Sequence, residues 1–180
     1  MEPDAFVKEL AALAPTSAEL ERLGFSKDEA SRSMESFLCT KRGHPLQAAG
    51  DSNKLLKLLS NWDLSKIEIG MIRFPNPPAE LLGTICVGCV EADPLLLLPD
   101  TGEVAVHELG IKGKRLWWVA RSGSELMDSM FIAARFLEAR GSGRIDFNDH
   151  SAARVVALEC ASAAGGDKYL DFYTMLLGAE

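Results

Sequence analysis

The sequence predicts an α+β protein with a small antiparallel or mixed sheet of about five strands, flanked by N-terminal and C-terminal helices. Three observations support this fold class. Residues 84–120 hold short apolar runs rich in Val, Ile and Leu, separated by turns that contain Pro or Gly. The segments before and after this stretch carry apolar residues at helical spacing. A chain of 180 residues, 47% of them apolar and 25% charged, is long enough for one good core. We expect one domain over 1–180, with its core sheet at about 65–120 and C-terminal helices at about 122–178.

The N-terminal part of the chain is expected to be helical. Apolar residues over 4–14 share one helical face, and Pro15 ends that helix. A further helical turn is expected over 16–23. Ser26 and Glu29 then have the spacing of a capping box, which predicts another helix that runs through residue 38.

A loop, a helix and a strand are expected to lead into the sheet. The polar stretch 40–50 indicates a loop, after which Asp51 and Ser52 are expected to cap a helix. The side chains that this helix would bury are Leu55, Leu58, Leu59 and Trp62. One strand is predicted over 67–74, and the Pro-rich stretch 75–78 indicates an extended connection to the remaining strands.

The rest of the sheet is expected to be a series of short antiparallel strands. We place these strands at 84–91, 95–98, 103–108 and 116–120. Asp93 and Pro94 are expected to form the first turn, because proline cannot donate a hydrogen bond to a strand ladder. In the third of these strands Val106 points to one face and Ala105 to the other. One face of the sheet should therefore meet a core, and the other should be more open.

Three helices are expected after the sheet. Ser122 and Glu125 have the spacing of a capping box, and the helix that follows should end near Gly141. An alanine-rich helix is predicted over 151–164. The final helix, over 169–177, has one of the most regular apolar stripes in the chain.

Composition and charge narrow the classes of function. No apolar run reaches the roughly twenty residues of a membrane span, and the N-terminus lacks the features of a secretory signal, so we expect a cytoplasmic protein without membrane contact. The chain holds 26 acidic and 19 basic residues, for a formal net charge of -7. This charge repels nucleic acid and attracts a basic protein surface.

The four cysteines, Cys39, Cys86, Cys89 and Cys160, are expected to be reduced, because they are too few and too scattered for a disulfide-stapled fold. Cys86 and Cys89 form a C-x-x-C motif, which with Cys39 and His44 would supply four zinc ligands. Residues three apart on a strand point to opposite faces, however, which argues against that site. We therefore expect no metal and no cofactor.

Two further motifs resemble catalytic sites. The run of Asp149, His150 and Ser151 has the residue types of a catalytic triad, but adjacent side chains cannot form its usual line, and a helix-start role is commoner. The glycines Gly110 and Gly113 resemble a phosphate loop, yet they precede a strand and not a helix. We expect a hairpin turn there, and no catalytic residue in this protein.

An acidic recognition surface is the functional alternative that the residues favour. Carboxylates concentrate at the predicted strand ends and turns, namely Glu91, Asp93, Asp100, Glu103 and Glu108. Charges at turns are also often simply solvated, and that alternative stays open. Trp117 is a candidate aromatic anchor for a partner, although a place in the core is an equal alternative, because Trp118 points to the other face.

The order of these motifs resembles the SUKH superfamily. The stretch 85–98 combines a glycine-containing strand, an Asp-Pro turn and an apolar strand. It is followed by Thr101-Gly102-Glu103-Val104, and then by Val119-Ala120 ahead of a helix that bears Phe136-Leu137. The resemblance covers about 65–140, and no binding residue of that family transfers to this chain.

The resemblance implies an α+β binding domain of a kind widely found in bacteria as immunity proteins, which neutralise toxins by binding them. Many such toxins look like nucleases with basic active surfaces, which agrees with an acidic inhibitor. We therefore expect a cognate toxin domain as the partner. Two alternatives stay open: a regulatory or scaffolding domain of the same fold without a toxin partner, and a metal- or thiol-dependent hydrolase that uses the cysteines and His107.

Overall fold

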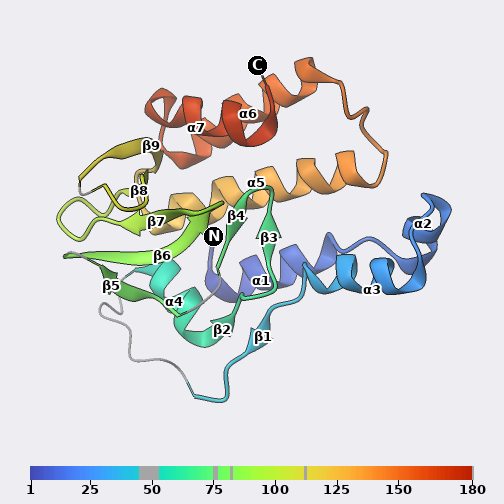
Figure 1. The fold of residues 1–180 in the computed structure, drawn as a ribbon, viewed down its shortest axis with the longest axis horizontal. Helices are drawn as coiled ribbons and strands as arrows, with labels where there is room; N and C mark the ends of the chain where they lie inside the picture. Colours follow the sequence, from blue (N-terminus) through green and yellow to red (C-terminus); the bar gives the residue numbers. More distant parts are fainter. Residues whose placement is uncertain (45–52, 75–76, 82, 112, 180) are drawn as a thin grey trace.

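The protein combines helices with an antiparallel sheet, as the α+β prediction requires. The computed structural model describes residues 1–44, 53–74, 77–81, 83–111 and 113–179. Its helices are α1 (Pro3–Ala12), α2 (Ser17–Arg22), α3 (Lys27–Glu35), α4 (Lys54–Asn61), α5 (Gly123–Gly141), α6 (His150–Ala164) and α7 (Leu170–Leu177), with a 3-10 turn η1 (Asp167–Tyr169) before α7. Figure 1 shows α2 and α3 at one end of the molecule and the long strands at the other.

Side-chain caps mark the starts of α3, α4 and α5. Ser26 and Glu29 form the predicted capping box at α3, because each side chain bonds the other residue's backbone N–H. At α5, Ser122 accepts the N–H of Glu125, but the Glu125 carboxylate instead pairs with Arg121. The cap of α4 is Asn53, whose side chain accepts the N–H groups of the first turn. The predicted caps at 51–52 lie outside the described residues.

The sheet has more strands than the five expected. In the described residues the main sheet has seven strands in the order β3-β4-β6-β7-β8-β9, with β5 also paired to β6, and every pair is antiparallel. Its strands are β3 (Glu68–Ile69), β4 (Ile72–Arg73), β5 (Ala79–Leu81), β6 (Thr84–Val90), β7 (Asp93–Leu97), β8 (Val104–His107) and β9 (Arg115–Ala120). The short strands β1 (Thr40–Lys41) and β2 (Trp62–Asp63) form a separate pair, where a loop and a helix end were expected.

The single strand predicted over 67–74 is wrong, because this segment is a tight hairpin of β3 and β4. Gly70 lies at the turn with φ 59°, a backbone conformation that glycine adopts without strain. Its missing side chain also leaves room for the apolar side chains beside it, since a Cβ there would lie 3.0 Å from Leu176. The hairpin therefore extends the sheet towards the C-terminal helices.

The turn predicted at Asp93 and Pro94 is also wrong, because both residues belong to β7. Pro94 pairs with Cys89 in the ladder, and the turn lies earlier, at Glu91 and Ala92, with Glu91 at φ 53°. Pairing between β7 and β8 begins only at Leu95, so Pro94 needs no N–H on that side.

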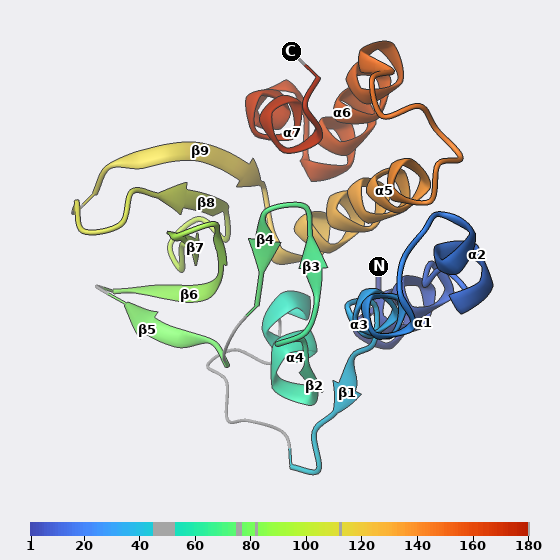
Figure 2. The same cartoon turned by 45° about the vertical axis from the view of Figure 1, so that its right-hand side comes forward.

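The two faces of the sheet have different environments. Residues that alternate along the strands on one face, such as Leu95, Val106 and Val119, join the main hydrophobic cluster with the helices. Leu96 and Ala105 are also buried, but they lie outside that cluster because they point to the opposite face. The prediction that the outward position of Ala105 would be open is therefore wrong at this residue. Figure 2 shows the helices α5, α6 and α7 on one side of the sheet.

Buried hydrogen bonds fix the C-terminal helices on the sheet. The Tyr173 hydroxyl of α7 donates to the backbone oxygen of Val119 in β9 at 3.0 Å, and it also contacts Ser129 of α5 at 2.5 Å. Trp117 packs on Phe172 with ring centroids 6.5 Å apart. The same helices that cover one face of the sheet thus hold its edge strand.

A β-bulge in β6 requires glycine at position 88. The ladder pairs Cys86 with Leu96 and Gly88 with Leu95, so Val87 is an extra residue in β6. A Cβ at Gly88 would lie 2.7 Å from the backbone oxygen of Arg73 and 3.1 Å from the ring of Phe74. Glycine therefore permits the close approach of β4 to β6.

Replacing Gly88 should consequently destabilise the fold. Gly88→Ala is expected to lower the free energy of unfolding by about 1–3 kcal/mol, the usual cost of overpacking, as measured by urea denaturation. Gly141→Ala, where an added Cβ meets nothing within 4 Å, is the matched control. Equal stabilities for the two variants would contradict the close approach.

Candidate protein-binding face

The face of the sheet opposite the helices is the candidate site. We name it the open face. Cross-strand registers place one row of side chains on it along Ala79, Cys86, Leu96, Ala105 and Trp118. They place Arg73, Cys89 and Pro94 in a second row, and they pair His107 with Arg115. At one edge of this face, Lys168 of η1 lies over the ring of Trp118. Most of these side chains are apolar or aromatic, which is the composition of an interface core.

A cavity of about 390 Å³ lies on the open face. Leu96 and Pro94 of β7 and His107 of β8 line it, and the β8–β9 turn contributes Leu109 and Ile111. Leu109 is 63% exposed and Ile111 48% exposed, values that are high for large aliphatic side chains. Leu81 of β5, which also lines the cavity, is 39% exposed. The cavity is thus an apolar hollow with solvent-exposed walls.

His107 supplies the polar group in this hollow. Its Nε2 atom is buried and finds no hydrogen-bond partner among the described residues. Burial, and secondly the nearby charge of Arg115, lower the pKa of this imidazole from its ordinary value of 6.5. Both effects favour the uncharged ring, which lines the hollow while its Nε2 atom stays buried.

The two tryptophans of β9 point to opposite faces of the sheet. Trp117, the predicted anchor, faces the helices and packs on Phe172. Trp118 lies opposite Ala105, on the open face, and two cations stack on its ring: Lys168 at 3.7 Å and Arg115 at 3.8 Å from the centroid. The sequence left Trp117 open between an anchor and a place in the core, and its contact with Phe172 favours the core.

Three of the five predicted carboxylates lie at one end of the sheet. Glu91 occupies the β6–β7 turn and is exposed, and Asp93 begins β7. The Asp93 carboxylate accepts the backbone N–H of Leu109 at 2.8 Å, which ties it to the β8–β9 turn. Glu108 in that turn pairs with Lys114. This acidic end adjoins the apolar hollow.

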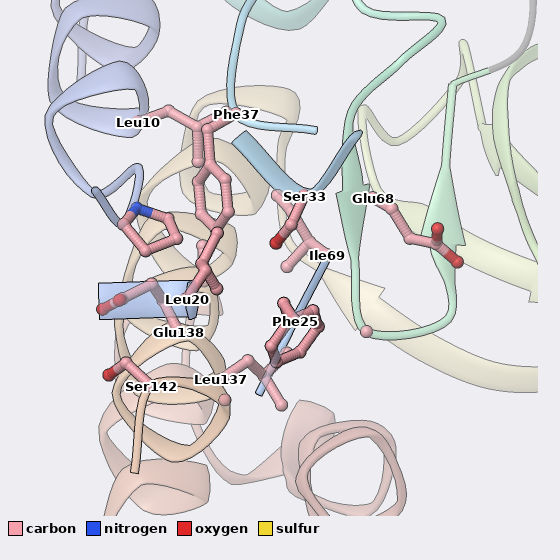
Figure 3. A pocket seen from close by; sticks show the side chains of 14 residues that line it. Leu10, Leu20, Phe25, Ser33, Phe37, Glu68, Ile69, Leu137, Glu138 and Ser142 are labelled. Atoms are coloured by element: carbon pink, nitrogen blue, oxygen red, sulfur yellow. The ribbon is translucent and has the colours of Figure 1, made fainter. Parts of the chain in front are cut away.

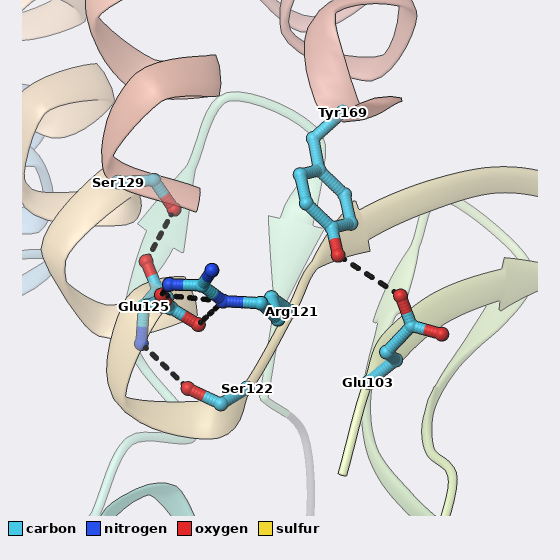
Figure 4. A network of polar contacts seen from close by, with 6 residues as sticks. All are labelled: Glu103, Arg121, Ser122, Glu125, Ser129 and Tyr169. Carbon is cyan, nitrogen blue, oxygen red and sulfur yellow. Dashed lines mark hydrogen bonds and ion pairs between the residues drawn. The ribbon is translucent and has the colours of Figure 1, made fainter. Parts of the chain in front are cut away.

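The other two carboxylates, Asp100 and Glu103, lie at the opposite end of the sheet, because successive turns of an antiparallel meander alternate between ends. Asp100 is exposed. Glu103 is turned towards the C-terminal helices, where its carboxylate accepts the Tyr169 hydroxyl at 2.9 Å (Figure 4). The same carboxylate pairs with Lys168. The five acids therefore do not form one patch.

The electrostatics of Glu103 indicate a structural contact. Burial raises the pKa of this carboxyl, but the bonds from Lys168 and Tyr169 outweigh that effect, so the pKa lies below its usual value. In turn, burial and the bond to Glu103 raise the pKa of Tyr169. Figure 4 also shows the separate group in which Arg121 pairs with Glu125 at the start of α5.

The bulge at Val87 corrects the geometry expected for the C-x-x-C motif. Cys86 lies opposite Leu96 and Cys89 opposite Pro94, so both cysteines share the open face. Burial raises the pKa of Cys86, and it raises that of Cys39 to about 12, which favours unreactive thiols. In the part of the chain that the structure describes, no three His, Cys, Asp or Glu side chains form a group suited to a metal ion.

The two motifs that resemble catalytic sites have structural roles. Asp149 caps α6 by accepting the N–H of Ala152 and the hydroxyl of Ser151, while the ring of His150 contacts the backbone oxygen of Gly178. Gly110, with φ 81°, lies in the β8–β9 hairpin turn. Lys112, which lies between Gly110 and Gly113 in the sequence, is outside the described residues.

A second cavity, of about 220 Å³, lies between the N-terminal helices, the β3–β4 hairpin and α5 (Figure 3). Phe25 and Phe37 come from one side, and Leu137 and Glu138 from α5. The Glu138 carboxylate is buried and paired with Arg144. None of the predicted site residues lines this cavity.

Comparison with family models, with curated proteins and with solved structures finds no match to this chain. In the described residues no helix combines the length and the apolar character of a membrane span. The resemblance to the SUKH superfamily therefore contributes only to the proposal below.

The lowered pKa of His107 predicts a pH-dependent stability. Below about pH 6.5 the unfolded imidazole binds a proton while the folded one stays neutral, so the free energy of unfolding falls as the pH falls. His107→Gln removes this contribution and should lose less stability between pH 7.5 and about pH 5. Urea denaturation across that range measures the difference. His44→Gln, which removes an exposed imidazole, is the control variant. Parallel curves for the wild type and His107→Gln would contradict the assignment.

Proposed function

We propose that this protein is an immunity protein that binds a cognate antibacterial toxin domain and neutralises it by direct protein–protein contact at the open face. The observation that carries the proposal is the apolar hollow on the uncovered side of the sheet, with Leu81, Leu109 and Ile111 exposed around it. The order of sequence motifs, which resembles the SUKH superfamily, supplies the class of partner.

The hollow provides a place for an apolar anchor of the partner. Burying one Leu, Phe or Met side chain contributes about 1.5–3 kcal/mol, and anchors of this kind dominate many interfaces. The imidazole of His107 lines the same hollow and supplies its polar side chain. An exposed apolar wall beside a polar group is thus suited to a protruding loop of another protein.

Charge supports a basic partner. The net charge of -7 attracts such a surface at long range, and Glu91 and Glu108 lie at the end of the sheet that adjoins the hollow. A toxin whose active cleft is basic, as in a nuclease, would be steered to this end and covered by the sheet. The inhibitor itself needs no reaction for this role.

The experiment that tests the function is co-expression with the proteins encoded beside this chain, followed by co-purification and growth measurements. Rescue of cells poisoned by one of those proteins, together with a stable complex, is the expected result. A complex without any toxicity to rescue would instead indicate a regulatory or scaffolding domain. Absence of both would contradict the proposal.

Apolar contacts in the hollow should determine affinity. Leu109→Asp combined with Ile111→Asp is expected to weaken binding of the co-purified partner by at least about tenfold, because the anchor loses its apolar wall. Isothermal titration calorimetry measures the affinity. Leu38→Asp, at a 50% exposed leucine that lies after α3, is the matched control. An unchanged affinity would exclude the hollow as the binding site.

Charge at the acidic end should determine the association rate. Glu91→Lys with Glu108→Lys is expected to slow association by about tenfold at low salt, with a smaller difference at high salt. Asp100→Lys, at the opposite end of the sheet, tests whether position and not net charge matters. Stopped-flow kinetics measure the association rates. If Asp100→Lys slowed association as much as each of the two substitutions at the acidic end does on average, the acidic end would have no special role.

A further inference from the structure

The outward face of α6 carries an apolar stripe that nothing in the described residues covers. Its inward face consists of small buried residues, among them Ala153, Ala157 and Cys160, which pack against α5 and α7. On the outward face Val155 is 56% exposed and Leu158 49% exposed. Because these two side chains lie one helical turn apart, they form a small contiguous apolar patch on the outward face.

The spacing of the outward residues matches a heptad. Ser151, Val155, Leu158 and Ser162 are all exposed and follow one another at intervals of four, three and four. These intervals are those of successive d, a, d and a positions in a coiled coil. Val155 then occupies an a position and Leu158 a d position. A β-branched residue at a with leucine at d favours a parallel pair of helices.

Two charged residues flank this seam in a self-complementary order. Arg154 occupies the g position before Val155, and Glu159 occupies the e position after Leu158. In a parallel pair, each g residue faces the e residue five positions further along the partner helix. Arg154 of one copy would therefore face Glu159 of the other, twice across a two-fold axis. An antiparallel pair would place g opposite g and e opposite e, which loses both attractions.

We propose that α6 is a self-association surface, on which a second copy of this chain packs its own α6 in parallel. The seam consists of Ser151, Val155, Leu158 and Ser162, and the pairs between Arg154 and Glu159 set its orientation. The seam spans less than two heptads, so it buries less than the roughly 1,200–2,000 Å² of a standard interface. The dimer is accordingly weak and forms at high protein concentration, and it leaves the open face of each sheet uncovered.

Sedimentation equilibrium of the purified chain up to about 1 mM tests the proposal. The average mass should rise towards that of two chains, and Leu158→Asp should keep the protein monomeric at every concentration. Leu38→Asp is the matched control, because it introduces the same change at a similarly exposed leucine. A wild-type protein that stays monomeric to about 1 mM, or a dimer that Leu158→Asp leaves intact, would overturn the proposal.

Charge variants test the parallel orientation. Arg154→Glu alone and Glu159→Arg alone should each weaken self-association by about fivefold or more, because each places like charges across the seam. An equimolar mixture of these two variants should restore association, and so should the double variant R154E/E159R. If the mixture associates no better than either variant alone, the parallel arrangement is wrong. Because these residues are exposed, circular dichroism should show the same fold throughout.

Discussion

The central constraint in this protein is that strand β7 is apolar on both faces while helices cover only one. Leu95 and Leu97 point into the main cluster, and Leu96 points away from it. On the helical side, Leu95 and Leu97 share one hydrophobic cluster with the helices, and the Tyr173 hydroxyl bonds the edge strand β9. On the other side Leu96 is also buried, but apolar side chains around it stay exposed and enclose the hollow. The proposed function follows from that asymmetry.

Backbone irregularities determine what the open face displays. The bulge at Val87 shifts the register of β6, so Cys86 and Cys89 share one face in place of alternating. Register shifts between β8 and β9 likewise place Trp118 on the open face and Trp117 on the helical one. Both shifts lie in the middle of regular-looking strands, where each one reverses the direction of the side chains beyond it. The apolar hollow is therefore a product of the register and not of composition alone.

Much of the fold could be predicted from local signals, and the site could be predicted less well. Helical spacing and the Ser26–Glu29 box located helices correctly, because caps and periodicity act within a few residues. The β3–β4 hairpin was missed because alternating apolar residues on both sides of Gly70 also fit one continuous strand. The alternation of turns in a meander would have shown that Asp100 and Glu103 lie far from Glu91. The bulge at Val87 depends on tertiary pairing, for which the sequence offers only the glycine at position 88.

The most direct test of the docking role is hydrogen–deuterium exchange of the chain alone and in complex with a co-purified partner. Our account predicts that binding slows exchange most in the β8–β9 turn around Leu109 and at the adjoining end of β6 and β7, next to the hollow. Helix α6 should show no added protection at concentrations where the chain is monomeric. Protection confined to the N-terminal helices or to α6, with the open face unchanged, would contradict the account.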